Sequence, residues 1–191
     1  GRIGWIELYG KKIGIQTVVL EEDAARIIDT KDKTTHYRLD RLGIPLLEIA
    51  TDPDITSPKQ CKAVAEAIGS LLRSVKVKRG IGTIRQDINV SIPGGARVEI
   101  KGAQDLSKVT DLCNNEISRQ QGLIEIQKQL HGSFAFNMQE IQAFASTQSQ
   151  VLKDKNIFGI KVEGAKGILG KELQPKKRFG TELSDHAKMY G

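Results

Sequence analysis

Acidic residues lie inside three stretches whose patterns are otherwise typical of β-strands. Glu48 lies in Gly-Ile-Pro-Leu-Leu-Glu-Ile-Ala-Thr, Asp87 in Thr-Ile-Arg-Gln-Asp-Ile-Asn-Val-Ser, and Glu99 in Arg-Val-Glu-Ile-Lys. A fourth apolar run, 13–20, is followed directly by three acids at 21–23. Carboxylate oxygens are the ligands that hard cations such as Mg²⁺ prefer, and Mg²⁺ usually binds together with phosphate. The residues therefore suggest a carboxylate-lined surface that holds a metal ion beside a phosphorylated substrate.

Each of these acids also has an ordinary structural explanation. Antiparallel sheets commonly leave one face in water, and alternation alone favours that explanation for Asp87. The acids at 21–23 could simply cap a turn. Glu48 differs because it shares a face with Leu46 and Ala50, and an unpaired carboxylate is costly to bury. Glu48 therefore needs a metal, a cation or a position at the rim of the core.

The strands that must position these acids are predicted from alternation. Apolar residues alternate after residue 12, so residues 2–20 predict a hairpin that turns at 9–12. Residues 27–35 are polar and charged and predict a loop. A short extended piece at 36–39 then leads into a strand at 44–51, which carries Glu48.

A second hairpin is predicted from residues 83–92 and 97–101, which both place polar side chains at odd positions. Matching their faces requires paired residue numbers with an even sum, because side chains alternate along each strand. That condition selects a three-residue loop, 93–95, whose last glycine would supply the left-handed residue. Asp87 would then lie opposite Lys101, which makes a carboxylate and an ammonium group cross-strand neighbours.

Helical spacing predicts three helices. Ser57-Pro58 is typical of an N-cap followed by a first-turn proline, and an apolar stripe continues from there. A second stripe covers 105–130, and a weaker pattern predicts a helix at 138–152. Residues 157–162 predict a strand.

The composition describes a basic globular protein. Its 191 residues are 39% hydrophobic, and no apolar run approaches the ~20 residues of a membrane span. Cys61 and Cys113 fall on the apolar stripes of predicted helices, which indicates a reducing, cytoplasmic setting. The start shows no signal peptide and no initiator Met, which suggests a fragment. The formal net charge of +6 favours a polyanionic partner.

Four motifs follow one another between residues 20 and 106. In order, they are Leu20-Glu-Glu-Asp-Ala-Ala-Arg, Leu39-Asp-Arg-Leu-Gly-Ile-Pro-Leu-Leu-Glu-Ile-Ala-Thr-Asp-Pro-Asp-Ile, Gly82-Thr-Ile-Arg-Gln-Asp-Ile-Asn-Val-Ser and Arg97-Val-Glu-Ile-Lys-Gly-Ala-Gln-Asp-Leu. This series resembles the tRNA-dependent amidotransferase subunits of types B and E. The segments Gly80-Ile-Gly-Thr and Lys101-Gly-Ala-Gln favour the archaeal type E over the bacterial type B.

The resemblance implies a reaction and partners. In that family, the subunit uses ATP and Mg²⁺ to phosphorylate the side-chain carboxylate of glutamate misacylated onto tRNA(Gln). Ammonia then displaces phosphate and gives Gln-tRNA(Gln). The ammonia comes from an asparaginase-like glutaminase, the subunit of type D, within a heterotetramer. Phosphoryl transfer depends mainly on positioning and charge neutralisation, which would explain the acids.

The resemblance also suggests roles for particular residues. Metal binding is expected at Glu22 and Glu48, and further at Asp87. Lys101 and Arg85 are expected to contact phosphate or the activated carboxylate, although for Lys101 this rests on the hairpin register. The family has a short motif with Glu and His near the start of the subunit. This sequence lacks it, so the chain alone is expected to be inactive.

The expected fold is α+β, with a mostly antiparallel sheet and packed helices. Residues 1–154 would form the latter part of a cradle-shaped catalytic domain. Residues 155–191 would begin a truncated insert like that of bacterial-type aspartyl-tRNA synthetases, because Gly167-Ile-Leu-Gly and Arg178-Phe-Gly-Thr-Glu resemble it. Lys176 stands there where glycine is expected.

The alternative is a non-catalytic, basic RNA-binding module. In that case Arg85, Arg97 and Lys101 would contact phosphate, and the acids would only neutralise one another. Binding of Mg²⁺ and ATP, and formation of glutamyl phosphate, would distinguish the two hypotheses.

Overall fold

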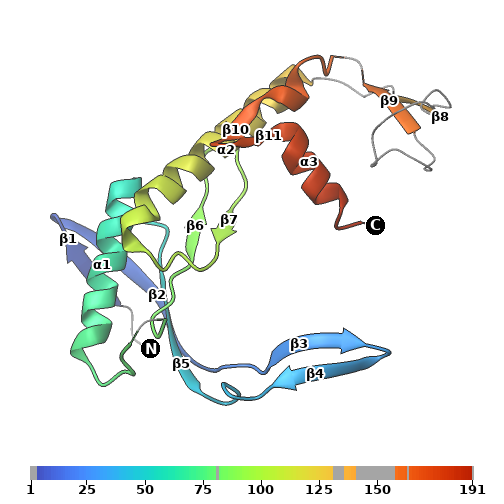
Figure 1. The fold of residues 1–191 in the computed structure, drawn as a ribbon. Helices are drawn as coiled ribbons and strands as arrows, with labels where there is room; N and C mark the ends of the chain where they lie inside the picture. The colour runs from blue at the N-terminus through green and yellow to red at the C-terminus, as the bar shows by residue number, and fades with distance from the viewer. Residues whose placement is uncertain (1–3, 81, 131–135, 141–157, 163, 191) are drawn as a thin grey trace. The chain divides into compact units, whose positions relative to one another are not determined.

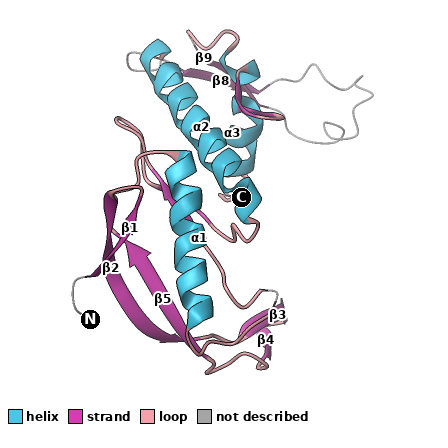
Figure 2. Cartoon of the chain, turned by 90° about the vertical axis from the view of Figure 1, so that its left-hand side faces the viewer, coloured by secondary structure: helices cyan, strands magenta, loops and turns pink. Residues whose placement is uncertain are grey.

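A computed structural model describes residues 4–80, 82–130, 136–140, 158–162 and 164–190 of the chain (Figures 1 and 2). The chain divides into two compact units, residues 1–84 and 85–191. Every strand pairing among the described residues is antiparallel. The prediction of helices combined with antiparallel sheet is therefore confirmed. No helix in this part of the chain is long and apolar enough to cross a membrane.

The described residues of the first unit form five strands and one helix: β1 (Gly4–Leu8), β2 (Lys11–Glu22), β3 (Arg26–Lys31), β4 (Thr34–Arg38), β5 (Pro45–Thr51) and α1 (Pro58–Ser74). Strands β1, β2 and β5 form a sheet in that order, and β3 pairs with β4 in a separate ribbon. Figure 2 shows α1 beside the three-stranded sheet. Ile13 of β2 is completely buried and Val64 of α1 is nearly so, which makes them the centre of this unit's core.

Local sequence signals set the ends of these elements. Tyr9 and Gly10 both have positive φ angles, as the two-residue turn of a hairpin requires, and they join β1 to β2. At the start of α1, the Ser57 hydroxyl accepts a hydrogen bond from the Gln60 N–H at 3.2 Å. Both the first hairpin and the Ser57 cap were predicted correctly.

The prediction of a loop at 27–35 was wrong, because β3 and β4 form a hairpin there. Asp32 and Lys33, with φ angles of 47° and 65°, form its two-residue turn. Neither strand contains a buried residue, so no alternation between a core face and a water face marks them in the sequence. Backbone pairing defines this ribbon, and the cross-strand contacts Thr30–Thr35 and Asp29–His36 add to it.

Where the structure describes it, the second unit combines short strands with two α-helices: β6 (Ile88–Val90), β7 (Val98–Ile100), the 3₁₀ helix η1 (Leu106–Lys108), α2 (Val109–Gln129), β8 (Phe136–Glu140), β9 (Phe158–Val162), the 3₁₀ helix η2 (Ile168–Gly170), β10 (Glu172–Gln174), β11 (Lys177–Arg178) and α3 (Phe179–Ala187). The predicted helix at 105–130 and the predicted strand at 157–162 correspond to η1–α2 and to β9. Cys113 is buried in α2, as its apolar position indicated.

The second predicted hairpin is confirmed in register but is shorter than expected. Its ladder pairs Ile88 with Ile100, Asn89 with Glu99 and Val90 with Val98. The residue in the left-handed conformation is Gly94, with a φ angle of 80°. The prediction that Gly95, the last glycine of the loop, would adopt this conformation was wrong. Proline followed by a left-handed glycine suits a type II turn, which the hydrogen bond from the Gly95 N–H to the Ile92 carbonyl closes at 2.9 Å.

The helix predicted at 138–152 was wrong for residues 138–140, which belong to β8 and pair with β9. Pairing between strands distant in sequence overrides the local helical spacing here. Residues 141–152 lie outside the described part of the chain.

The C-terminal segment packs on α2. Ile168 and Leu173 are buried against Ile126 of α2, and Phe179 adds to this cluster. A Cβ atom at Gly122 would lie 2.7 Å from Leu173 Cδ2, so the small residue permits the close approach of β10 to the helix. Figure 1 shows β10 and β11 beside α2. The boundary expected near residue 154 stays a prediction.

Candidate functional site

The β2–β5 ladder positions the acids of the first unit. Glu48 lies opposite Val19, Glu21 opposite Leu46 and Glu22 opposite Pro45. Residues directly opposite share a face, and successive residues alternate between faces. By this register Glu48 and Glu21 lie on one face, whereas Glu22 lies on the other. The ladder therefore brings Glu21, rather than the predicted Glu22, beside Glu48.

All three of these glutamates have exposed side chains, although Glu48 was expected beside buried neighbours. Leu46 and Ala50, on the same face, are half-buried. Glu48 thus lies at the rim of the apolar surface. A rim position was one of the three explanations expected for it, beside a metal and a cation, because burying an unpaired carboxylate is costly. At the rim, water still reaches its oxygens.

Asp23 has a structural role at the end of β2. Its backbone N–H donates to the Ile44 carbonyl at 2.8 Å, and its own carbonyl accepts from Gly43 at 3.0 Å. Its carboxylate pairs with Arg41 Nε at 3.4 Å and accepts from the Ala24 N–H at 3.0 Å. For this member of the acidic cluster, the turn-capping explanation is confirmed.

In the second unit, the predicted site residues lie on the exposed side of the β6–β7 hairpin. Arg85, Asp87 and Glu99 are exposed, whereas Ile88 and Val90 are buried. The alternation predicted for 83–92 therefore holds for burial, even though the ladder covers only 88–90. Asp87 and Glu99 therefore lie on a face exposed to water, in agreement with the explanation that one face of an antiparallel sheet is commonly solvated.

Hydrogen bonds hold the two ends of the hairpin together beyond its ladder. Asp87 Oδ1 accepts from the Gly102 N–H at 2.8 Å, and the Gln86 carbonyl accepts from the Ala103 N–H at 2.8 Å. The Lys101 ammonium pairs with Glu99 Oε2 at 3.2 Å. Because both groups of this ion pair are well exposed, it contributes little to stability, and the ammonium group can exchange it for another anion.

A buried polar network behind this hairpin was missed by the sequence analysis. Gln120 of α2 donates to the Val90 carbonyl at 3.2 Å and to Glu116 Oε1 at 2.9 Å, and it accepts from the Ile92 N–H at 3.3 Å. Gln120 and Glu116 are only 3% and 7% exposed. Their helical spacing places both on the apolar stripe of α2, and that departure from apolar character is the signal that could have identified them.

The network continues to the C-terminal helix. Arg119 donates to Glu116 Oε1 at 3.0 Å and, through Nε, to both carboxylate oxygens of Glu182 on α3 at 2.9 and 3.0 Å. The hydrogen bonds that Arg119 donates to the Glu182 carboxylate raise the pKa of Arg119 above its ordinary value. Four side chains thereby connect α2, α3 and the β6–β7 hairpin by hydrogen bonds; they are Glu116, Arg119, Gln120 and Glu182.

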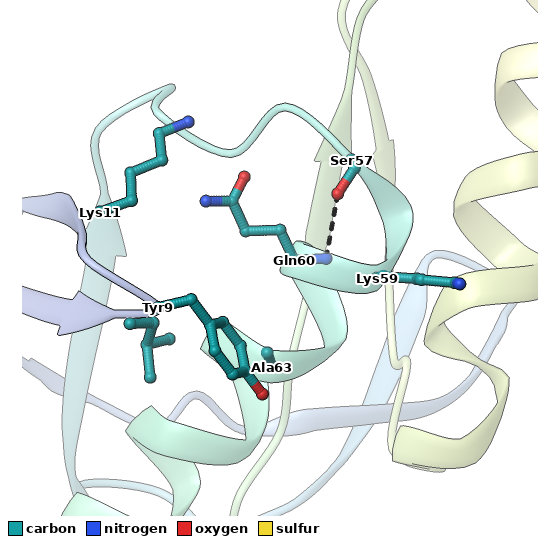
Figure 3. Close-up of a pocket in the computed structure, with 7 residues that line it drawn as sticks. Tyr9, Lys11, Ser57, Lys59, Gln60 and Ala63 are labelled. Atoms are coloured by element: carbon teal, nitrogen blue, oxygen red, sulfur yellow. Dashed lines mark hydrogen bonds between the residues drawn. The ribbon is translucent and has the colours of Figure 1, made fainter.

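A pocket of about 480 Å³ lies in the first unit, between the β1–β2 turn and the first turn of α1. Figure 3 shows Tyr9, Lys11 and Lys59 around it, with the Ser57–Gln60 hydrogen bond at its edge. Lys11 Nζ donates to the Asp54 carbonyl at 2.5 Å, so its ammonium group is already satisfied in part. None of the predicted site residues lines this pocket.

Within the described residues, no group of three His, Cys, Asp or Glu side chains is placed to hold a metal ion. Glu21 and Glu48 nevertheless supply exposed carboxylates from one face of one sheet. Such a pair of oxygen donors suits a hard cation that keeps several of its waters.

Comparison with known protein families agrees with this sequence pattern. The family model for the GatB/GatE catalytic domain matches residues 1–162. The glutamyl-tRNA(Gln) amidotransferase subunit of type E from Methanobrevibacter smithii is 47% identical over 193 residues, which cover 98% of this chain and 31% of that protein. The proteins of the same name from Sulfolobus acidocaldarius and Pyrococcus abyssi are 48% and 47% identical, over 97% and 98% of this chain. The chain spans about a third of the length of these relatives.

Proposed function

The chain belongs to the GatB/GatE catalytic-domain family, and from that premise we propose that it acts within the catalytic domain of a tRNA-dependent amidotransferase subunit of type E. The observation that carries the proposal is the match of the family model to residues 1–162. Identity close to 47% with proteins named as type E subunits of glutamyl-tRNA(Gln) amidotransferase supports the type of subunit.

The proposed reaction has two steps. First, the side-chain carboxylate of the glutamate on tRNA(Gln) attacks the γ-phosphorus of ATP, which forms an acyl phosphate and releases ADP. Then ammonia attacks the activated carbonyl carbon, and phosphate leaves as the amide of Gln-tRNA(Gln) forms. An asparaginase-like glutaminase, the subunit of type D, would supply the ammonia within a cytoplasmic heterotetramer.

The exposed acids are the groups that would hold Mg²⁺. Glu48 remains a candidate in the first unit and Asp87 in the second, and Glu22, on the other face of the sheet from Glu48, remains the family-based candidate. The β2–β5 register supports Glu21 as the neighbour of Glu48. When bound, Mg²⁺ neutralises charge on the phosphates.

The basic residues of the hairpin would bind the anionic groups of the reaction. Lys101 lies next to the ladder, and its ion pair with Glu99 is open to water. Its ammonium group can therefore exchange that carboxylate for a phosphate or for the reacting carboxylate. Arg85 is exposed on the same polar side and has the fork of donors that phosphate oxygens accept. Both residues would orient substrate rather than change its covalent bonds.

The proposal is tested in the intact subunit that carries this chain, assembled with its glutaminase. Formation of Gln-tRNA(Gln) and of ADP is followed in a single turnover with Glu-tRNA(Gln), ATP and glutamine. Glu48→Gln and Asp87→Asn should each lower both rates about a hundredfold or more, because a charge that stabilises the transition state is lost. Glu66→Gln is the matched control, since Glu66 is an exposed acid on α1 that pairs with Lys62.

Wild-type rates in both Glu48→Gln and Asp87→Asn would refute the assignment of the acids. The alternative, a non-catalytic RNA-binding module, is favoured only by the net charge of +6. It predicts tRNA binding with no tRNA-dependent formation of ADP by the wild-type subunit.

A further inference from the structure

The β3–β4 ribbon is the feature of the first unit that neither the core nor the proposed site uses. It is a two-stranded sheet by itself, and Figure 1 shows it continuing outwards beyond β2 and β5. All but two of its strand residues, Asp29 and Thr35, are exposed. A two-stranded hairpin of this kind is only marginally stable in water. Its exposed residues are therefore available to contact a partner.

One face of the ribbon carries a pair of arginines directly opposite each other. The register pairs Arg26 with Arg38, and both guanidinium groups are exposed. Residues directly opposite have Cβ atoms about 5 Å apart, and like charges in that position destabilise a hairpin. Repulsion between the two arginines therefore destabilises the ribbon when nothing is bound. An anion that binds between or across the two guanidinium groups would remove this repulsion.

Asp29, the acid on this face, interacts with residues other than the two arginines. Because of a bulge after Ile27, Asp29 lies opposite His36, on the same face as the arginines. Its Oδ1 is 2.6 Å from His36 Nδ1, and its Oδ2 is 3.8 Å from Lys31 Nζ. Among the described residues, neither the Arg26 nor the Arg38 side chain has an ion-pair or hydrogen-bond partner.

We propose that the Arg26–Arg38 face of the β3–β4 ribbon binds the phosphate backbone of the tRNA substrate. Two planar guanidinium groups side by side present forked donors that match phosphate oxygens. Lys31 extends the basic face towards the tip, where the turn residue Lys33 adds a further positive charge. Such contacts position an RNA without reading its sequence. This inference rests on the proposed function, which supplies the tRNA.

The ribbon's geometry also favours RNA over a small phosphate ligand. The 480 Å³ pocket in the first unit is lined by other elements, and both arginines of this face are exposed to solvent. An extended backbone with a repeating charge suits such a surface, whereas ATP is usually bound in a concave site.

The test measures binding of a tRNA(Gln) transcript to the intact subunit across a range of salt concentrations. The variant Arg26→Gln/Arg38→Gln should reduce the slope of log affinity against log salt by about two, one for each lost phosphate contact. From about 50 to about 200 mM salt, its affinity should then fall roughly tenfold less than that of the wild type. At about 50 mM salt the variant should bind at least tenfold more weakly.

Matched variants separate charge from folding. Lys108→Gln/Lys188→Gln removes the same number of charges from two exposed residues that already pair with carboxylates in their own turns, and its binding should change less than about twofold. Arg26→Lys/Arg38→Lys should keep the wild-type slope. Because the repulsion is relieved, the Gln variant should have an unchanged or higher Tm, which a damaged fold would not show.

An unchanged slope in Arg26→Gln/Arg38→Gln, or an equal change in the control variant, would overturn the inference. Loss of ATP affinity with intact tRNA affinity would overturn it as well, because the arginines would then bind nucleotide phosphates. Each of these three results leaves the proposed function standing if the wild-type subunit forms Gln-tRNA(Gln). Absence of that product in the wild type would instead remove the proposed function.

Discussion

Replacing Gln120 with methionine should destabilise the second unit while preserving its packing. The side chain is 3% exposed and of similar length to methionine, so the change removes hydrogen bonds with little change in volume. It leaves the Val90 carbonyl and the Ile92 N–H without the partners that Gln120 provides. Glu116 keeps its bond to Arg119.

The magnitude follows from the two orphaned backbone groups. A buried group left unsatisfied costs about 1–3 kcal/mol; the hydrogen bond to Val90 is buried and the one from Ile92 is half-buried, so the free energy of unfolding should fall by about 3 kcal/mol. For a chain of this size, that corresponds to a decrease in Tm of roughly 6–12 °C. The neighbouring variant Gln121→Met is the control, because Gln121 is exposed and its replacement should change the free energy by less than about 0.5 kcal/mol.

Urea unfolding followed by circular dichroism reports on α2, the longest helix described. The chain's one tryptophan, Trp5, lies in the first unit, so its fluorescence reports separately on that unit. The expected result is a lower midpoint by circular dichroism for Gln120→Met and not for Gln121→Met. Equal midpoints for Gln120→Met and the wild type would show that these hydrogen bonds do not hold the hairpin on α2, and would refute the reasoning.

Three further changes test other local features. Lys176→Gly should raise the free energy of unfolding by about 1 kcal/mol by thermal denaturation, because Lys176 has a φ of 64° that costs an L-residue energy; a loss of stability would contradict this. Ser57→Ala should destabilise α1 by about 1 kcal/mol through loss of its cap, whereas Ser57→Asp should not, as measured by helical ellipticity on heating. Lys171 donates a hydrogen bond to Glu125, which lowers the pKa of that carboxyl group in the folded protein. The contact therefore stabilises the fold at pH values above the pKa of the unfolded state, and this stabilisation is lost as the pH falls through the pKa of the folded state. Amide protection factors in β10, which correct for the intrinsic exchange rate at each pH, should therefore fall on acidification in the wild type, and a Glu125→Gln variant with the same acid response would disprove the link.

Local chemistry made several elements predictable. The Ser57 cap, the stripe of the helix that begins near residue 105 and the register of the second hairpin all depend on residues close in sequence. For that hairpin, an even sum of paired residue numbers followed directly from the alternation of polar and buried positions. The ordered motifs likewise carried the family resemblance, because they need no knowledge of which residues meet.

The errors have a common cause. The β3–β4 ribbon shows no apolar alternation since neither face is buried, and residues 138–140 pair with a strand about twenty positions away. The choice of Gly95 failed because residues 92–95 form a turn with proline at its second position and a left-handed glycine at its third, as in type II. In each case the deciding interaction was a backbone pairing or turn geometry that composition does not reveal.

The sequence by itself determined the family, the basic character of the chain and the acids and cations that could serve a phosphoryl transfer, because these depend on residue type and order. Only the tertiary structure decided which side chains share a face. It placed Glu21 beside Glu48 through the β2–β5 register, put two arginines opposite each other on the ribbon, and buried Gln120 and Glu116 behind the β6–β7 hairpin. The physical reason is that pairing register and packing join residues far apart in the chain, and a shift of one position reverses every side chain.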